Sequence, residues 1–158
     1  MNGPLAPGST IGIIGGGQLG RMLAMAAARL GYRTIVLEPQ ADCPAAQVTN
    51  RQIVAAYDDP AALAELGTAC DVVTYEFENV PVGAAAALAS RAKVSPPPMA
   101  LEVSQDRLTE KSFVNAAGIP TAAWAMVGDG LAPATAAEVR AAADRIGGFP
   151  VAQKARRG

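Results

Sequence analysis

Short apolar runs alternate with longer amphipathic segments along the first part of the chain. Residues 11–15 form a β-branched run that ends in glycines, and residues 34–37 and 71–74 are similar short runs. Between the first two runs, residues 18–30 carry leucine, methionine and alanine at helical spacing, and Gly31 follows as a stop signal. This alternation predicts an α/β fold with a Rossmann-like parallel sheet.

Capping residues and prolines predict the other elements of this part. Asp58 or Asp59 stands before Pro60, and an acidic cap followed by proline favours a helix start. Pro81 starts another predicted helix after the loop at 75–80. The sequence also predicts strands at 52–56 and 93–95, and it predicts that these two helices end near Gly67 and near Arg91.

Three consecutive prolines, Pro96 to Pro98, cannot continue a helix or a central strand and predict a domain boundary. We therefore expect a flexible leader at 1–10, a Rossmann-like domain at 11–97 and a second segment at 98–158. The predicted elements of the second segment are a helix from near Ser104 to Ala117, strands at 121–127 and 150–155, a turn at 128–133, and a helix capped by Thr135 that runs to about Ile146.

Glu138 stands three residues after Thr135, which predicts a capping box at the start of that last helix. The second segment offers little sheet on which to bury its helices. We expect it to be an incomplete α+β unit, loosely held.

The composition excludes several function classes for this segment. The chain has 158 residues, a formal net charge of -1 and no histidine. Near-zero charge gives no footprint for nucleic acid, and the absence of histidine excludes histidine-based catalysis and histidine–metal sites. The apolar runs at 22–28 and 84–89 are far shorter than the roughly 20 residues that span a membrane.

Cys43 and Cys70 are isolated, with no CxxC spacing that would indicate a zinc or redox site. A disulfide between them is compatible with the sequence but is not needed. The start of the chain lacks the pattern of a signal peptide. We expect a cytoplasmic protein that binds neither nucleic acid nor membrane.

Gly15, Gly17 and Gly20 form a GxGxxG spacing between a predicted strand and a helix. Such glycines let the backbone approach an anion at the helix N-terminus, and Glu38 ends the next strand, where a dinucleotide-binding fold places its ribose acid. An NAD(P)-dependent oxidoreductase domain is therefore one hypothesis. The alternative is that the glycines only make a tight strand-to-helix turn.

Glu76 and Glu78 follow another predicted strand. Ligands of open parallel sheets bind at the carboxyl ends of the strands, so Glu76 and the glycine turn are expected to face one crevice. A carboxylate there can bind an amine or a sugar hydroxyl. The alternative is a solvated acidic loop in which Asn79 caps the next helix.

Cationic residues gather in the second segment. Arg107 and Lys111 lie one helical turn apart, and either a phosphate ligand or the neighbouring acids Asp106 and Glu110 would neutralise them. In the predicted last strand, Lys154 and Arg156 project to one side and Arg157 to the other. That strand end either meets a nucleotide phosphate or is solvated.

Four motifs occur together in order: GGGQLGRM at 15–22, YEFENV at 75–80, QDRLTEK at 105–111 and GIPT at 118–121. In combination they resemble the amino-terminal part of the 5-(carboxyamino)imidazole ribonucleotide synthases, ATP-grasp ligases of purine biosynthesis. The resemblance extends over nearly the whole chain from Ile11 onward. It implies a pre-ATP-grasp domain followed by the first part of an ATP-grasp domain.

The resemblance implies an ATP-dependent carboxylation. ATP phosphorylates bicarbonate to carboxyphosphate, and the carboxyl carbon passes to the exocyclic amine of 5-aminoimidazole ribonucleotide. Catalysis of this kind depends on positioning and on charge neutralisation by Mg rather than on a side-chain nucleophile, so no catalytic residue is expected in this segment. The resemblance also implies a homodimer for the full-length enzyme.

By the same resemblance, the backbone at Gln18 and Leu19 and the side chain of Glu76 contact the aminoimidazole ribonucleotide, and Arg107 and Lys154 contact ATP. Gln153 departs from the apolar residue that the family places before this lysine. The glycine-rich phosphate loop and the Mg-binding carboxylates of the family have no counterpart before Gly158, so we expect the segment alone to be inactive. A non-catalytic binding module is a third hypothesis beside the ligase and the oxidoreductase.

Overall fold

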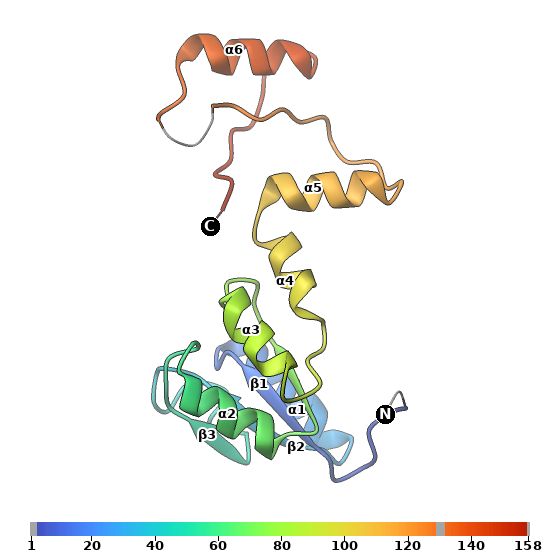
Figure 1. The fold of residues 1–158 in the computed structure, drawn as a ribbon, viewed down its shortest axis with the longest axis vertical. Coiled ribbons are helices and arrows are strands. Elements are labelled where there is room, and N and C mark those ends of the chain that lie inside the picture. Colours follow the sequence, from blue (N-terminus) through green and yellow to red (C-terminus); the bar gives the residue numbers. More distant parts are fainter. Residues whose placement is uncertain (1–2, 129–131, 158) are drawn as a thin grey trace. The chain divides into compact units, whose positions relative to one another are not determined.

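The computed structural model describes residues 3–128 and 132–157 of the chain. The chain divides into two compact units, of which the first ends at Glu102 and the second begins at Val103. Figure 1 shows the elements of both units in chain order. Each unit is described by itself below.

The first unit is built on a parallel sheet. Its strands are β1 (Thr10–Ile14), β2 (Arg33–Leu37), β3 (Arg51–Ile53) and β4 (Val72–Tyr75), in the spatial order β3-β2-β1-β4. Strand β1 pairs with β2 on one side and with β4 on the other, and each pairing is parallel. Since the strands run in the same direction, the segments that follow β1, β2 and β4 meet at one edge of the sheet.

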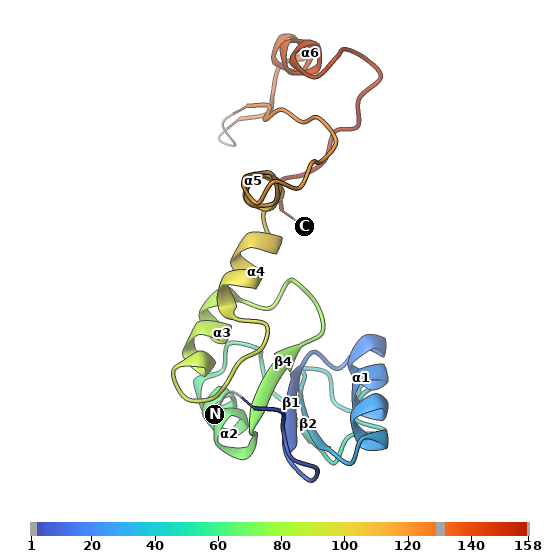
Figure 2. The same cartoon turned by 90° about the vertical axis from the view of Figure 1, so that its right-hand side faces the viewer.

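Helices cover both faces of this sheet, as an α/β fold requires. Helix α1 (Gln18–Arg29) lies on one face, and α2 (Pro60–Ala69) and α3 (Val82–Ala89) lie on the other (Figure 2). The Asp59 side chain caps α2 by accepting a hydrogen bond from Ala62 N–H at 2.8 Å. The predicted α/β fold with a Rossmann-like parallel sheet is therefore confirmed.

The hydrophobic core lies between the sheet and α2 and α3. Its most deeply buried side chains come from all of these elements and from α4 (Pro98–Ser104): Ile14, Leu37, Leu66, Val73, Leu88 and Leu101. A smaller buried cluster of Val36, Cys43 and Ala45 lies beside it. Cys43 and Cys70 are both buried free thiols, and burial raises the pKa of Cys70 to about 11.

Two predictions about the first unit were wrong, and one helix was not predicted. The third strand ends at Ile53, three residues earlier than predicted. The predicted strand at 93–95 is a single bridge between Val73 and Val94, because Pro96 has no N–H with which to continue the ladder. Helix α4 was not predicted from the sequence, and Pro98 occupies its first position, where the missing N–H costs nothing.

The second unit contains α5 (Arg107–Ala116) and α6 (Ala136–Arg145). The sequence predicted one helix from near Ser104, but Ser104 ends α4 and a new helix begins after Asp106. The Asp106 carboxylate accepts hydrogen bonds from the N–H groups of Leu108 and Thr109, and such a cap starts a helix. The capping box of Thr135 and Glu138 is confirmed.

The predicted strands at 121–127 and 150–155 are absent from the described part of the second unit. A strand needs a neighbouring strand to satisfy its backbone, and here side chains bond to that backbone instead. Lys111 donates to the Ala122 carbonyl at 3.3 Å, Arg145 to Met126 at 3.3 Å and Arg107 to Ala155 at 3.1 Å. The turn predicted at 128–133 lies partly outside the described residues.

The other structural predictions concern the ends of the chain and membranes. In the predicted leader, Gly8 N–H donates to the Gly31 carbonyl at 2.8 Å, and the Leu5 carbonyl accepts from the Tyr32 hydroxyl at 2.9 Å. None of the helices in residues 3–128 and 132–157 has the length and apolar character to cross a bilayer.

Candidate functional site

Two acidic side chains flank the glycine turn of the first unit, and the sheet order explains why. The turn follows β1, Glu38 follows β2 directly, and Glu76 follows β4 directly. Because β2 and β4 are the two neighbours of β1, their carboxyl ends place one acid on each side of the turn. The predicted approach of Glu76 to the glycine turn is confirmed.

Glu76 binds the start of helix α1. One carboxylate oxygen accepts from Gly17 N–H at 3.1 Å, and the other accepts from Gly20 N–H at 3.0 Å. Gly17 is the N-cap residue of α1 and has no side chain to serve these amides. The half-buried carboxylate thus satisfies two orphan donors at the positive end of the helix dipole.

Glu38 holds the turn from the other side. Its Oε2 accepts from Gly16 N–H at 2.8 Å and from the Tyr57 hydroxyl at 2.5 Å, and its Oε1 accepts from Gln40 N–H at 3.2 Å. Burial, followed by the hydrogen bond to Glu38, raises the pKa of Tyr57 above its usual value. The phenol is therefore a stable donor at neutral pH.

Two glycines are required by this geometry. Gly15 has a φ of 104°, which side-chain-bearing residues rarely adopt, and a Cβ there would overlap the Glu76 side chain. A Cβ on Gly20 would overlap the Gly15 carbonyl oxygen. The GxGxxG spacing therefore has a local purpose: it lets α1 start close to the turn and lets Glu76 reach its amides.

The same hydrogen bonds bear on the dinucleotide hypothesis. A pyrophosphate bound to a GxGxxG turn uses the free amides at the helix N-terminus. Here the amides of Gly16, Gly17 and Gly20 donate to the chain's own carboxylates. Glu38, the predicted ribose acid, bonds to the turn itself, so the arrangement does not favour an NAD(P) site.

Gln18 and Leu19 lie between the two amides that Glu76 binds. Both residues are exposed in the first turn of α1, and Leu19 is 56% exposed. The structure thus brings together the three residues predicted to contact an aminoimidazole ribonucleotide. Their surface combines an exposed backbone turn with a fixed carboxylate, which suits a ligand rich in hydroxyl and amine groups.

The second unit has its own polar cluster around Asp106. This carboxylate is buried and accepts from Arg156 Nε at 2.7 Å and from Arg157 Nε at 3.4 Å, in addition to capping α5. The hydrogen bond from Arg156 is the main reason why the pKa of Asp106 lies well below its usual range. The prediction that Arg157 points away from Arg156 was wrong, because the segment is not a strand and both arginines turn to Asp106.

Arg107, one of the two predicted ATP ligands, bonds to the backbone that follows Lys154, the other. Arg107 Nε donates to the Ala155 carbonyl at 3.1 Å, and Arg107 N–H donates to the Arg156 carbonyl at 3.0 Å. Lys154, directly before Ala155, is exposed. Lys111 donates to the Ala122 carbonyl, and the ion pairs of Asp106 are with Arg156 and Arg157.

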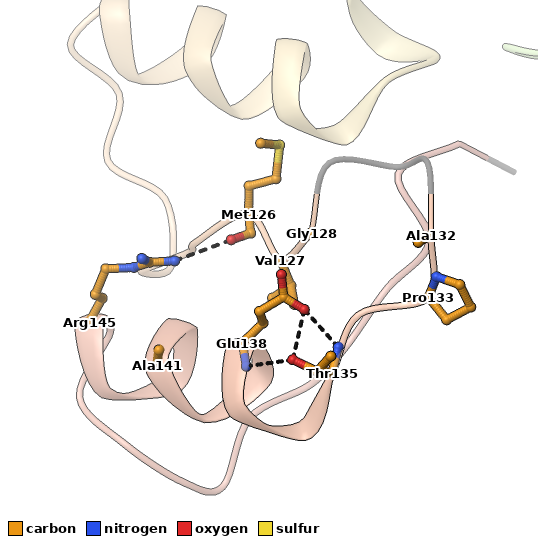
Figure 3. A pocket seen from close by; sticks show the side chains of 9 residues that line it. All are labelled: Met126, Val127, Gly128, Ala132, Pro133, Thr135, Glu138, Ala141 and Arg145. Carbon is orange, nitrogen blue, oxygen red and sulfur yellow. Dashed lines mark hydrogen bonds between the residues drawn. The ribbon is translucent and has the colours of Figure 1, made fainter.

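A separate hollow of about 530 Å³ lies in the second unit beside α6 (Figure 3). Thr135, Glu138 and Arg145 are its polar lining residues, and their hydrogen bonds serve the capping box and the Met126 carbonyl. None of the residues predicted to bind a ligand lines it. The hollow therefore adds nothing to the candidate site.

Sequence reasoning missed Tyr57 and the part that Asp106 plays. The signal for Asp106 was present, since an aspartate directly before a helical pattern is a favourable N-cap. Tyr57 lies in the segment between β3 and α2, where no local pattern indicates a partner. Only the parallel order of the strands brings it to Glu38.

Comparison with known proteins supports this reading of the fold. Residues 8–105 match the family model of the ribonucleotide synthetase pre-ATP-grasp domain. The N5-carboxyaminoimidazole ribonucleotide synthase of Brucella melitensis is 76% identical over 125 residues, which are 79% of this chain and 34% of that protein. The chain thus spans about a third of the length of this curated relative.

Two solved structures superpose on this chain and share its fold. The N5-carboxyaminoimidazole ribonucleotide synthetase of Thermotoga maritima superposes with a TM-score of 0.80 at 38% identity, over 95% of this chain and 39% of that one. The N5-carboxyaminoimidazole synthase of Aspergillus clavatus gives a TM-score of 0.76 at 31% identity, over 89% of this chain and 36% of that one.

Proposed function

Because the chain belongs to the ribonucleotide synthetase pre-ATP-grasp family, we propose that it is the amino-terminal part of an ATP-dependent ligase that carboxylates 5-aminoimidazole ribonucleotide. The observation that carries this proposal is the Glu76 carboxylate, bound to the amides of Gly17 and Gly20 beside the exposed Gln18 and Leu19. The Aspergillus clavatus neighbour was solved with ADP and 5-aminoimidazole ribonucleotide, which supports the same ligands here.

The proposed reaction has two steps. The γ-phosphoryl group of ATP passes to a bicarbonate oxygen, which gives carboxyphosphate and ADP. The exocyclic amine of the ribonucleotide then attacks the carboxyl carbon, phosphate leaves, and the amine gives up a proton. No side-chain nucleophile is needed, because holding the reactants together supplies most of the rate.

In this scheme the first unit binds the acceptor. Glu76 is an acceptor-only group with both oxygens fixed by backbone amides, so its remaining lone pairs point at a constant place for a ribonucleotide hydroxyl or amine. The backbone at Gln18 and Leu19 completes that contact. Preorganisation of this kind reduces the entropy lost on binding.

In the second unit, Arg107 and Lys154 bind ATP. Arginine offers a planar fork and lysine a mobile point charge, and both suit phosphate oxygens. The backbone bond between Arg107 and Arg156 connects the segments that carry them. Bicarbonate as the carboxyl source and a homodimer as the complete enzyme are further parts of the proposal.

Magnesium, which the family implies, would neutralise phosphate charge during the transfer. The residues described here do not fit a magnesium site, because no three carboxylate or thiol groups gather within residues 3–128 and 132–157. Glu38, Glu76 and Asp106 each accept hydrogen bonds from backbone amides.

A chimera tests the proposal without any assumption about where the natural protein ends. This chain replaces the matching amino-terminal part of the Brucella melitensis enzyme, to which it is 76% identical over 125 residues. We expect ADP formation that depends on both bicarbonate and 5-aminoimidazole ribonucleotide. An inactive but folded chimera, beside an active parent enzyme, would contradict the proposal.

Two controls separate the rival hypotheses. The oxidoreductase hypothesis requires saturable binding of NADH or NADPH to the 158-residue chain, and the occupied amides of Gly16, Gly17 and Gly20 lead us to expect none. The 158-residue chain alone should form no ADP above background. ADP formation by the chain alone would show that Arg107 and Lys154 need no further ATP-binding part.

A further inference from the structure

Tyr57 contacts the candidate site in two ways that no predicted role explains. Its hydroxyl donates to Glu38 Oε2 at 2.5 Å. Its ring packs against the ring of Phe77, with centroids 5.5 Å apart and planes tilted by 57°. Phe77 is the residue directly after Glu76 in the chain. The half-buried Tyr57 side chain therefore contacts both Glu38 and the neighbour of Glu76.

These contacts form a continuous ring of interactions around the glycine turn, which we call the circuit. Starting at Gly16, it passes through the carboxylate of Glu38 to the phenol of Tyr57, and through the ring contact to Phe77. From Phe77 the backbone leads to Glu76, whose carboxylate returns to Gly17 and Gly20. The glycine turn is thus held between the carboxylates of Glu38 and Glu76, and the contact between Tyr57 and Phe77 connects these two acids.

Two kinds of contact hold the circuit together: hydrogen bonds to a carboxylate and a contact between two aromatic rings. The Glu38 carboxylate is shared between a phenol and a backbone amide, and charge-assisted bonds of this kind are about twice as strong as neutral ones. The ring contact is of the tilted aromatic type, which stabilises beyond the burial of the two rings. Loss of the hydroxyl leaves the ring contact in place, so the two contributions can be separated experimentally.

We propose that Tyr57 and Glu38 are positioning residues that fix the glycine turn and thereby the Glu76 carboxylate for the acceptor ribonucleotide. Neither residue is assigned to touch the ligand. Their effect passes through Gly16 on one side and through Phe77 on the other. The inference rests on the proposed function for the identity of the ligand, while the circuit itself is a property of this chain.

The first test measures the turn directly in the 158-residue chain. In the Tyr57→Phe variant, Glu38 loses one donor, and we expect the amide hydrogen exchange of Gly16 and Gly17 to accelerate about tenfold. Amides of strand β2 should exchange as in the parent chain. Tyr32→Phe is the matched control, because Tyr32 also donates one hydroxyl bond, at 2.9 Å to the Leu5 carbonyl.

The second test uses the active chimera. We expect Tyr57→Phe to raise the KM for 5-aminoimidazole ribonucleotide about fivefold, with the KM for ATP and kcat changed less than twofold. Tyr57→Leu, which also removes the ring contact with Phe77, should raise that KM further. A purely structural role would lower active protein without this selective change in KM.

The outcomes of the two tests are distinguishable. Equal exchange rates and equal KM values in Tyr57→Phe and Tyr32→Phe would overturn the inference, whatever the ligand. A chimera without activity would contradict the proposed function, while the exchange rates would still decide whether Tyr57 and Glu38 hold the turn. Rapid exchange with an unchanged KM would show that the turn can loosen without moving Glu76, and would also overturn the inference.

Discussion

The two units of this chain satisfy their backbones and bury their side chains in different ways. In the first unit a four-stranded parallel sheet pairs its own backbone, and helices on both faces bury a core. In the second, α5 has no buried residue, and Phe113, Met126 and Phe149 are each more than half exposed. Polar contacts with Asp106, Asn115 and Arg145 hold its loops instead.

This difference shows what a sheet contributes beyond hydrogen bonds. A strand brings its apolar neighbours to one face, so pairing and burial occur together. Where no sheet forms, as in the described part of the second unit, side-chain donors or water satisfy the carbonyls, and such bonds bury little apolar surface. We therefore expect the first unit to depend on core packing and the second on a few polar side chains.

The largest expected effect is in the core of the first unit. Leu66 is fully buried against the sheet. Leu66→Ala should lower the free energy of unfolding of that unit by about 3 kcal/mol, because it removes apolar contacts and leaves a cavity. Phe113→Ala is the comparison in the second unit, where a half-exposed ring should contribute about 1 kcal/mol or less.

Separate probes follow the two units during urea unfolding. Cys43 and Cys70 are buried in the first unit, so the rate of thiol labelling reports its opening. Trp124, the single tryptophan of the chain, reports the second unit by fluorescence. We expect Leu66→Ala to shift thiol labelling and leave the Trp124 midpoint in place. Equal shifts of both probes would show that the units unfold as one.

Asp106 should be the most sensitive residue of the second unit. Asp106→Ala removes the α5 cap and both arginine contacts, whereas Asp106→Asn keeps a good cap and removes the charge. We expect the Trp124 midpoint in urea to fall in the order parent, Asn variant, Ala variant, with no change in thiol labelling. An Asn variant equal to the parent would mean that the arginine contacts contribute nothing.

The same residue predicts the acid behaviour of the second unit. The arginine contacts lower the pKa of Asp106 in the folded protein, while an unfolded aspartate has a pKa of about 3.9. The stabilisation is therefore complete above that value and is lost as pH falls through the folded pKa. The parent and Asp106→Asn should differ in Trp124 midpoint at pH 7, and the difference should shrink steadily as pH falls below about 3.9 toward the folded pKa.

Much of the first unit could be predicted from the sequence because each signal there is local. Residues 11–15 alternate with a helix of clear period, Gly31 ends that helix, and Asp59 with Pro60 starts the next. Tertiary structure agrees with these local preferences, so the predicted and observed elements differ mostly by one or two residues. The place of Glu76 followed from the parallel order of the strands.

The wrong or missing predictions share one cause. Each depends on which distant group pairs with a segment or a side chain. Residues 121–127 have a weak strand pattern, but no described strand of this unit pairs with them, and Lys111 and Arg145 bond to their carbonyls instead. Tyr57 reaches Glu38 only through the sheet order. A single sequence shows what a segment prefers, but not which distant group will satisfy it.

The capping box tests whether local signals stabilise the second unit without a sheet. The Thr135 hydroxyl accepts from Glu138 N–H, and the Glu138 carboxylate accepts from Thr135 N–H at 2.7 Å. Thr135→Ala should destabilise α6 by about 1 kcal/mol, and Thr135→Ser by much less. Amide exchange at the start of α6 measures the effect. If the alanine variant matches the serine variant, the box does not stabilise the helix.

The smallest expected effect is that of the surface ion pair between Arg51 and Glu65 in the first unit. Their side chains are 45% and 53% exposed, so water already solvates both charges. Glu65→Gln should change the free energy of unfolding by about 0.5 kcal/mol or less, and 1 M salt should abolish the difference. Thiol labelling in urea, with and without salt, measures this difference.

Asp106, whose side chain is 3% exposed, should behave in the opposite way, because its contacts should resist the same salt. If the exposed pair proved as important as the Asp106 contacts, charge would stabilise the two units equally, and the contrast between a packed unit and a polar one would not hold.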